Sequence, residues 1–432
     1  MVAVLIYFVL LSMQYPGLQK TQIIISPGQS GLITRTIQKA IDSCAVTGGG
    51  EVLFQAGTYL TAGIQLKSNV TLTLRKGAIL LGSDKYSDYE DDAFIFGKDL
   101  SDITINGEGT IDGADCYNPG GEEGFRGPHC IRLINCKNII LKGFTIKNSA
   151  NWAINCRYCS FAKVDKVSIR GGHDGLHTRF CDNFKVTGCD FRTGDDSFAG
   201  NDNRDFEISA CLVNTSCNGF RLGCMNLSVK HCTLWGPGES MHKIQKRNNM
   251  LSAFVHFSPE DEHPHLQSGN WTIEDITVRD VDNFYIYNYK NGLWQTGQPV
   301  TTIKFRGVKA TGILSAFYII GDSALRFSMS IKNSSFIFRE GAISNSDTFE
   351  GAKLHSTDFF YANSFNKIEL QEITLGKKGA GSILTCSSGN SLSLENINFI
   401  TGKSSIPYSL DMITEIKKKD LKLNSSEIIS DK

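Results

Sequence analysis

The sequence predicts an all-β protein folded as one right-handed parallel β-helix, in which every coil adds short strands to long parallel sheets. The composition is the first observation: 42 glycines against 9 prolines, with abundant Val, Ile, Thr and Phe. This mixture is typical of many short strands joined by tight turns. The second observation is an apolar pattern that recurs every 21 to 23 residues, a period found in solenoids.

The repeat is a nine-residue segment with apolar residues at its second, fourth, seventh and ninth places. Such segments begin at Asn138, Phe161, Asn183, Asp205 and Asn226. The same frame reappears, with longer excursions between coils, at Asn270, Thr302, Ser328, Lys367 and Ser391. The period is too short for a propeller blade and lacks the helical half of a leucine-rich repeat, so it favours a parallel β-helix.

The 13 cysteines follow the same frame. Two places before the segment start stand Cys136, Cys159, Cys181 and Cys224, and at its seventh place stand Cys189, Cys211 and Cys232. We interpret both sets as small apolar core columns. A zinc site at Cys156 and Cys159 is not favoured, because no second CxxC or paired histidine lies at metal spacing. Disulfides between stacked coils remain open.

A short helix is expected before the repeats. Ile33, Ile37, Ala40, Ile41 and Cys44 share one helical face. The glycines at 48–50 end this helix, which we expect to cap the open end of the solenoid. The solenoid is expected to form one domain over residues 21–412, and the charged residues 413–432 are expected to be a frayed tail.

The segment Val2–Ser12 is apolar, uncharged and too short to span a bilayer, and it has the length of a signal-peptide core. We therefore expect residues 1–20 to be a signal peptide and the protein to be secreted or periplasmic, although no Lys or Arg precedes Lys20. Lys+Arg and Asp+Glu both number 44. This balance provides no global field for nucleic acid or an anionic membrane, so we expect neither as a partner.

Three carboxylates are predicted to converge on neighbouring coils. The place thirteen beyond each segment start is occupied by Asn151, Asp174, Asp196, Asn218 and Glu239. Asp195 adjoins Asp196, so Asp174, Asp195 and Asp196 share one patch. Stacked like charges raise at least one pKa, which glycoside hydrolysis requires because it uses one protonated and one ionised carboxyl group. The alternative is that GHDG and GDDS are polar turns in which Asp bonds nearby backbone.

The stretch GGHDGLHTRFCDNFKVTGCDFRTGDDSFAG resembles the active-site region of family 28 glycoside hydrolases, the polygalacturonases and their relatives. The resemblance extends through GGGEVLFQAGTYLTAGIQLKSNVTL, GEGTIDGA and NSANWAINCRYCSFAKVDKVSI, over residues 48–238. It implies a pectin-lyase-like solenoid that inverts configuration while cleaving galacturonate-type bonds in pectin. It also implies that Asp195 is the general acid and that Asp174 and Asp196 hold and deprotonate the water, with acid and base about 6.5–9.5 Å apart.

Two departures from the family pattern affect the expected site. Gly172-His173 replaces the family's Asn-Thr, and Cys217-Asn218-Gly219 replaces its Gly-His-Gly, so the histidine of that motif is absent. His173, His177 or Arg221 are the candidates to replace it. The family's Arg-Ile-Lys clamp is also absent, and MHKIQKRNNM lies in its neighbourhood.

The expected substrate-binding residues are His173, His177, Asn218, Arg221, His242, Lys246 and Arg247. Arg221 and His177 share the sixteenth register place and should border the aspartates. Arg221 and Arg247 are favoured because guanidinium binds a carboxylate through two hydrogen bonds. For the cations of 242–247, a solvated loop is the alternative. We expect an acidic polysaccharide or oligosaccharide substrate, a monomer, and neither a cofactor nor a metal.

Two other functions remain open. A calcium-dependent pectate-lyase-like enzyme would use the same architecture, with the aspartates as calcium ligands. A non-catalytic carbohydrate-binding β-helix is the second, because a fold alone implies no chemistry. The insertion at 258–269 would close one end of a groove and favours exo action.

Overall fold

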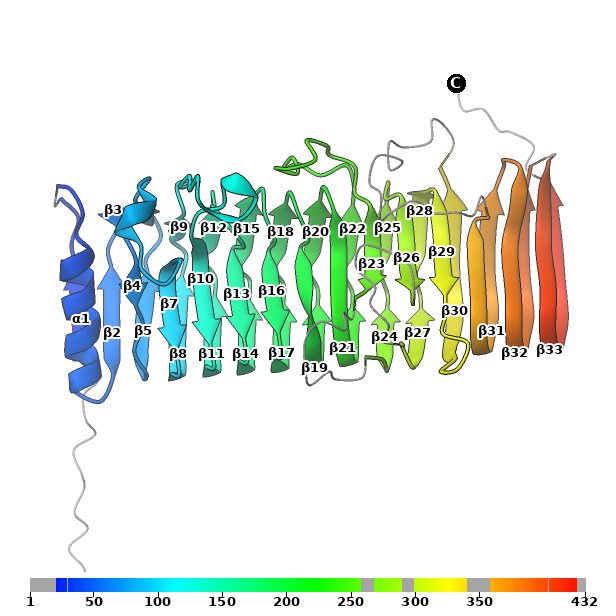
Figure 1. Ribbon diagram of the computed structural model, residues 1–432, viewed down its shortest axis with the longest axis horizontal. Coiled ribbons are helices and arrows are strands. Elements are labelled where there is room, and N and C mark those ends of the chain that lie inside the picture. Colours follow the sequence, from blue (N-terminus) through cyan, green and yellow to red (C-terminus); the bar gives the residue numbers. More distant parts are fainter. Residues whose placement is uncertain are drawn as a thin grey trace, which may run out of the picture.

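The computed structural model describes residues 21–28, 30–257, 268–289, 299–339, 358–402 and 404–425. The chain forms one long rod of stacked coils with a helix at its N-terminal end (Figure 1). All strand pairs are parallel, so the predicted parallel β-helix is confirmed. The expected signal segment, residues 1–20, and residues 258–267 of the insertion lie outside the described residues.

Three faces run the length of the rod. The first face contains β1 (Thr21–Ile25), β2 (Gly50–Phe54), β5 (Val70–Leu74), β8 (Ser101–Gly107), β11 (Lys137–Lys142), β14 (Ser160–Asp165), β17 (Asp182–Thr187), β24 (Trp271–Glu274) and β27 (Thr302–Arg306). The second contains β3 (Gly57–Thr61), β6 (Ala78–Gly82), β9 (Thr110–Asp112), β12 (Thr145–Lys147), β15 (Ser168–Gly171), β18 (Asp190–Thr193), β20 (Leu212–Thr215), β22 (Thr233–Trp235), β25 (Thr277–Arg279) and β28 (Lys309–Ile313).

The third face contains β4 (Ile64–Gln65), β7 (Ala93–Lys98), β10 (His129–Ile134), β13 (Ile154–Arg157), β16 (Leu176–Arg179), β23 (Ser252–His256), β26 (Asn283–Asn288) and β29 (Ser315–Ile320). Six longer strands bend from one face to the next: β19 (Phe198–Ser209), β21 (Asn218–Lys230), β30 (Phe327–Phe338), β31 (Phe360–Lys377), β32 (Gly381–Thr401) and β33 (Ser405–Ser425). Two short 3-10 turns, η1 (Tyr86–Asp88) and η2 (Glu122–Gly124), lie in excursions between coils.

The apolar places of the repeat stack as predicted. Ile139 pairs with Ala162, Ala162 with Phe184, and Phe184 with Phe206, so the second place of each segment forms one inward column. Aromatic residues extend the core in the same way, and the rings of Phe198 and Phe220 stack 4.7 Å apart. Each coil therefore buries its apolar side chains against its neighbours.

The cysteine columns are core, as the frame predicted. All thirteen cysteines lie within the described ranges, and each is buried and carries a free thiol. The structure therefore answers the question that the sequence left open, because no stacked pair among them is bridged.

The N-terminal end of the solenoid has the expected helix, whereas the C-terminal end differs from the expected tail. Helix α1 (Thr34–Val46) buries Ile37, Ile41 and Cys44 completely, as expected for a cap. Within the described residues no helix is both long and apolar enough to cross a membrane. The frayed tail expected from residue 413 is wrong for 413–425, which complete β33 in register with β32. Ile413 and Leu421 pack on the core, a pattern that the intervening lysines hide in the sequence.

Candidate active site

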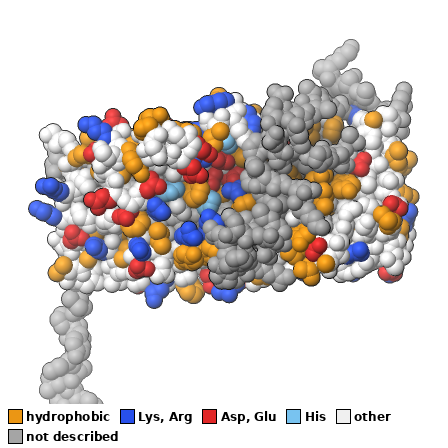
Figure 2. All heavy atoms as spheres, viewed as in Figure 1, with side chains coloured by type: hydrophobic (Ala, Val, Ile, Leu, Met, Phe, Trp, Pro, Cys, Tyr) orange, Lys and Arg blue, Asp and Glu red, His pale blue; other side chains and the backbone are white. Residues whose placement is uncertain are grey.

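The acidic residues lie in the turns that lead from the second face to the third. Asp174 lies between β15 and β16, and Asp195 and Asp196 lie between β18 and β19. The backbone ladder continues through these turns, because Gly175 N–H donates to the Asp196 carbonyl at 2.8 Å and Ser197 N–H to that of Asn218 at 3.0 Å. Asp174, Asp196 and Asn218 therefore occupy successive rungs, as predicted. Acidic side chains gather near the middle of the displayed face, with histidines beside them (Figure 2).

The prediction is wrong for Asn151 and Glu239, the outer members of the expected column. Ile154 pairs with Leu176, which places Trp152 rather than Asn151 level with Asp174, because the coil from Asn138 is one residue longer than the next. At the other end Ser252 pairs with Asn218. The expected Glu239 lies instead in an inserted segment, residues 236–250, where its carboxylate pairs with Arg192.

One side-chain oxygen from each of the three aspartates lies within 4.8 Å of the others. This is closer than the spacing of about 6.5–9.5 Å that the resemblance implied for acid and base. A single water that donates to two oxygens at about 2.8 Å bridges oxygens roughly 4.6 Å apart. Oxygens within 4.8 Å of one another are close enough for two carboxylates to bind one water between them.

Asp174 is buried and fully engaged. Its Oδ2 lies 2.8 Å from His177 Nδ1, and its Oδ1 accepts the backbone N–H of Asp196 at 3.2 Å. Burial, followed by the charges of Asp195 and Asp196, raises the pKa of Asp174 well above its usual range. Both oxygens of Asp174 thus have a protein partner, and its surroundings disfavour the charged form.

Asp196 is held by an amide and a guanidinium group. Its Oδ1 accepts a hydrogen bond from Asn218 Nδ2 at 2.8 Å, and its Oδ2 pairs with Arg221 Nε. The Arg221 guanidinium also lies 4.2 Å from the ring of Phe257. Sequence reasoning placed Arg221 beside the aspartates correctly, and the structure shows its charge committed to Asp196.

Asp195 is the aspartate that a ligand can reach. Its side chain is 18% exposed, whereas those of Asp174 and Asp196 are 3% exposed. Burial by itself raises the pKa of Asp195, but His242, Arg221 and Arg126 together outweigh burial and lower it. The pKa values of the inner Asp174 and the accessible Asp195 are therefore shifted in opposite directions.

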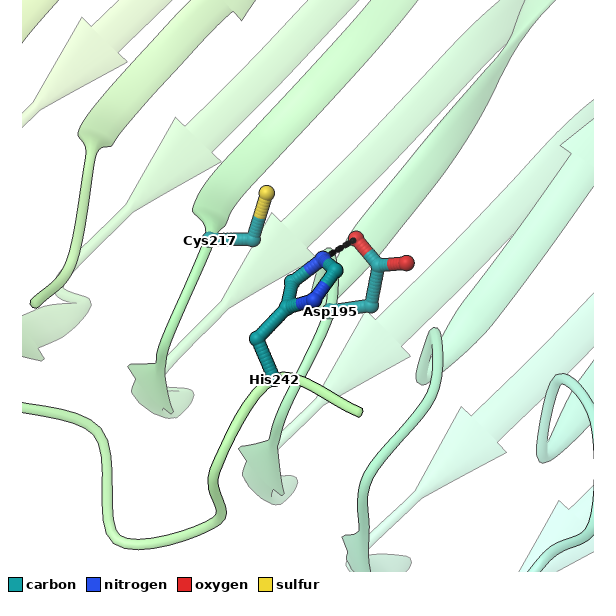
Figure 3. Close-up of side chains that lie close together, drawn as sticks. All are labelled: Asp195, Cys217 and His242. Carbon is teal, nitrogen blue, oxygen red and sulfur yellow. Dashed lines mark ion pairs between the residues drawn. The ribbon is translucent and has the colours of Figure 1, made fainter. Parts of the chain in front are cut away.

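His242 reaches Asp195 from the inserted segment 236–250 (Figure 3). Its Nε2 lies 3.6 Å from Asp195 Oδ1, and its Nδ1 accepts the backbone N–H groups of Ile244 at 3.2 Å and Gln245 at 3.1 Å. Because Nδ1 is an acceptor, the ring must carry its proton on Nε2, the nitrogen that faces Asp195. The sequence placed His242 among the substrate-binding candidates and gave no sign of this contact.

Cys217 completes a trio with Asp195 and His242 whose ligand atoms lie within 4.8 Å of one another (Figure 3). A neutral imidazole that coordinates a metal through Nε2 must carry a proton on Nδ1, but two backbone donors occupy that atom. Burial, then Asp196 and Asp195, also raise the pKa of the Cys217 thiol. The donor set therefore does not fit a metal ion without rearrangement.

Arg126 also approaches Asp195, and sequence reasoning did not name it. It lies in the excursion 113–128, outside the repeating frame, next to η2. Its Nε contacts Glu123 Oε2 at 2.7 Å and its Nη2 lies 3.8 Å from Asp195 Oδ2. Arg126 and His242 thus approach Asp195 from two excursions that are 116 residues apart in the sequence.

The remaining predicted residues lie around this centre. His177 stacks on Trp152 with ring centroids 3.6 Å apart, and burial lowers its pKa well below the usual range. His173 packs on Phe125 at 5.8 Å, burial lowers its pKa to about 3, and its Nε2 has no hydrogen-bond partner among the described residues. Both imidazoles are therefore neutral.

The predicted cations of the inserted segment differ in position. Arg247 donates from Nε to Gln245 Oε1 at 2.6 Å and from Nη1 to the Asn249 carbonyl at 2.9 Å, so it braces the segment itself. Lys246 is exposed in a turn with φ of 50°. The structure brings neither of them into hydrogen-bond contact with the aspartates among the contacts that it defines.

The segment 236–250 is fixed by close backbone approach. A Cβ on Gly194 would lie 2.5 Å from the Met241 carbonyl oxygen, and a Cβ on Gly172 would lie 2.5 Å from Lys243 Cε. Lys243 Nζ also lies 2.5 Å from Asp115 Oδ1 of the excursion 113–128. The two excursions therefore meet beside the aspartates and hold Arg126 and His242 against Asp195.

Comparison with known proteins shows which enzymes this chain resembles. The chain is a parallel β-helix whose residues 44–229 match the model of the family described as "Glycosyl hydrolases family 28". A "Probable polygalacturonase" of Vitis vinifera is 28% identical over 171 residues, which are 34% of this chain and 35% of that protein. An "Exo-poly-alpha-D-galacturonosidase" of Dickeya chrysanthemi is 48% identical over 60 residues, 14% of this chain and 10% of that protein.

Among solved structures, an exopolygalacturonase of Thermotoga maritima matches with a TM-score of 0.59 and 17% identity, covering 74% of this chain and 88% of that one. This likeness supports the fold. The chain spans about a third and a tenth of the length of the two curated relatives. Residues 44–229 are therefore similar to the family 28 glycosyl hydrolases.

Proposed function

We propose that the protein hydrolyses glycosidic bonds between galacturonate-type units of an acidic polysaccharide such as pectin. The observation that carries the proposal is the carboxylate cluster. In it Asp174, whose pKa is raised, lies within 4.8 Å of the accessible carboxyl group of Asp195. Hydrolysis of a glycoside needs one protonated and one ionised carboxyl group at the same bond. The match of residues 44–229 to the hydrolase family supports the same chemistry.

In the proposed reaction Asp195 is the general acid, because its side chain is the most exposed of the three. Because burial and two neighbouring carboxylates raise the pKa of Asp174, we propose that Asp174 carries the proton in the free protein; coupled carboxyl groups titrate as one unit. A sugar carboxylate that approaches Arg126 weakens the field of that cation on Asp195 and so favours transfer of the proton to Asp195. Asp174 is then ionised and available as a base.

The glycosidic bond is then broken by proton donation on one side and attack of a water on the other. Asp195 gives its proton to the departing glycosidic oxygen while the oxygen of a water bonds to the anomeric carbon. The water loses one proton to the pair Asp174 and Asp196, whose oxygens lie close enough to bind one water between them. His242, with its proton on Nε2, orients the Asp195 carboxylate and stabilises it once it has lost its proton.

We further propose exo action on chain ends. The contact between Lys243 and Asp115 joins two excursions beside the aspartates, which narrows access from that side. The printed name of the Dickeya chrysanthemi relative describes the same mode. Defined oligogalacturonates test this proposal, because an exo enzyme releases one short product from every chain length.

The decisive experiment compares the full chain with its Asp195→Asn variant on polygalacturonan and rhamnogalacturonan. We expect the native protein to release reducing ends and the variant to lose about 10²- to 10⁴-fold of the rate. Asp165→Asn, an outward-facing carboxylate on β14, is the matched control and should keep the native rate. Failure of the native protein to release reducing ends from either polymer would contradict the proposal.

The same assay separates hydrolysis from the lyase alternative. The three aspartates offer oxygen ligands of the type that calcium prefers. A lyase would lose its activity with excess chelator and would form unsaturated uronides, which absorb in the ultraviolet. We expect neither result.

A further inference from the structure

A second column of side chains runs along the edge where each coil enters the first face, at a different corner of the coil from the aspartates. One residue of each coil has a positive φ there, between 53° and 64°: Asn69, Asp102, Asn138, Phe161, Asn183, Asp205, Asn226 and Asn270. Asn and Asp tolerate this left-handed conformation, whereas a bulky residue adopts it only with strain. Phe161 is the exception in the column.

The polar members of this column support one another. Asn138 Nδ2 donates to Asp102 Oδ1 at 3.0 Å, and Asn226 Nδ2 donates to Asp205 Oδ1 at 2.7 Å. Phe161 interrupts this ladder, because strand register places it between Asn138 and Asn183. The backbone of Phe161 has φ of 56°, and the residue is 58% exposed. Its ring therefore belongs neither to the hydrogen-bonded ladder nor to the core.

A second aromatic residue, Tyr158 in the turn before β14, also has φ of 56°. Its ring stacks on Phe180 of the next coil with ring centroids 5.0 Å apart. Packing between rings therefore accounts for Tyr158. It does not account for Phe161, whose backbone is strained and whose ring is exposed, and strain that a fold retains at one position points to a function there.

Phe161 borders a hollow of about 370 Å³. Asn69, Asp102 and Asn138 of this column line it. So do Thr71, Thr104, Ile140 and Lys163, from outward-facing places on β5, β8, β11 and β14. These strands follow one another along the lower edge of the rod (Figure 1). The hollow thus combines one aromatic face with amide, hydroxyl, carboxylate and ammonium groups.

We propose that this hollow is a second saccharide-binding site, separate from the aspartates, in which one sugar ring packs on Phe161. A pyranose has an apolar C–H face that suits an aromatic ring and an edge of hydroxyl groups that suits Asn, Asp and Thr side chains. Lys163 provides a cation for the carboxylate of an acidic unit. The site goes beyond the proposed function, because it needs no bond cleavage and would hold the polymer while its chain end is processed.

The test is electrophoresis of the full chain through native gels that contain polygalacturonan or neutral galactan. We expect the native protein to be retarded, and Phe161→Asn to bind about three- to tenfold more weakly. Asn is the residue type of the neighbouring coils at this place and tolerates the positive φ, so this variant should keep or raise the thermal midpoint. Leu325→Asn, which replaces a residue 62% exposed elsewhere, is the matched control and should migrate as the native protein.

Retardation in polygalacturonan alone would identify an acidic saccharide as the ligand, and retardation in both gels would show that the ring face suffices. The proposal is overturned if Phe161→Asn migrates like the native protein, or if the native protein is retarded in neither gel. Reducing-end release from trigalacturonate is measured in parallel. If the native protein releases no reducing ends from trigalacturonate but is still retarded in a way that depends on Phe161, only the proposed hydrolysis is contradicted.

Discussion

The imidazole of His242 meets the carboxylate of Asp195 at 3.6 Å, although the two residues come from different coils. Two backbone N–H groups fix the ring so that Nε2–H faces the carboxylate. The usual family motif places a histidine in a neighbouring turn, and here Cys217, Asn218 and Gly219 occupy that turn. The histidine contact with the proposed acid therefore comes from the segment 236–250, and not from the turn 217–219.

We expect His242→Ala to move the pH profile of kcat/KM. His242 is among the groups that lower the pKa of Asp195, so its removal raises that pKa and shifts the limb that reports Asp195 to higher pH. Loss of orientation should also lower kcat/KM by about 100-fold. His242→Gln, which keeps a side-chain donor, should recover part of the rate. Ile244→Ala, on the same segment with its backbone donor intact, is the control, and an unshifted profile in His242→Ala would contradict the assignment.

Asp174→Asn should stabilise the protein at neutral pH. Burial and two neighbouring carboxylates raise the pKa of Asp174. The stability linked to its proton is therefore present below the usual carboxyl range and is lost as the pH rises through the raised pKa. The variant avoids that loss, so its thermal midpoint should exceed the native value near pH 8 and approach it near pH 4. An equal decrease at both pH values would show that the hydrogen bonds of Asp174 outweigh its charge.

Gly194→Ala should displace the segment that carries His242. Its Cβ would lie 2.5 Å from the Met241 carbonyl oxygen and 2.7 Å from that of Gly172, so backbone must move. We expect a loss of about 1–3 kcal/mol in the free energy of unfolding together with most of the activity. Gly171→Ala is the matched control, because its Cβ would meet nothing nearer than 3.7 Å. Equal denaturation curves for the two variants would contradict this close fit.

The anomer of the first product tests how the water is held. Carboxyl groups about 5–5.5 Å apart are typical of retaining glycosidases, and wider pairs of inverting ones. The aspartate oxygens here lie within 4.8 Å, yet we expect inversion, because Asp174 and Asp196 can hold a water together. NMR of the product from a defined oligosaccharide shows the anomer directly. A retained configuration would make one aspartate a nucleophile.

The repeat period predicted what lies in register. Counting along coils of nearly equal length brought Asp174, Asp196 and Asn218 onto one column, and likewise His177 and Arg221. The frame carries no information about excursions, whose paths depend on long-range contacts. The contacts of Arg126 and His242 with Asp195 were therefore invisible in the sequence.

Charge patterns were less informative than register. Residues 413–425 look like a polar tail because lysines separate the apolar residues, but strand alternation places Ile413 and Leu421 on the core. Arg221 suggested a clamp for a sugar carboxylate, whereas its nearest carboxylate is Asp196. A sequence shows that a cation is present without showing which anion neutralises it.

The buried thiols can report local opening of the rod along its length. Cys44 lies in the capping helix and the others follow along the rod as far as Cys386, and each is buried where it lies. A thiol reagent can therefore reach a given cysteine only when that coil opens, and the rate at each position measures the free energy of the local opening. Thirteen natural reporters would show whether this solenoid loosens from its ends or beside its aspartates.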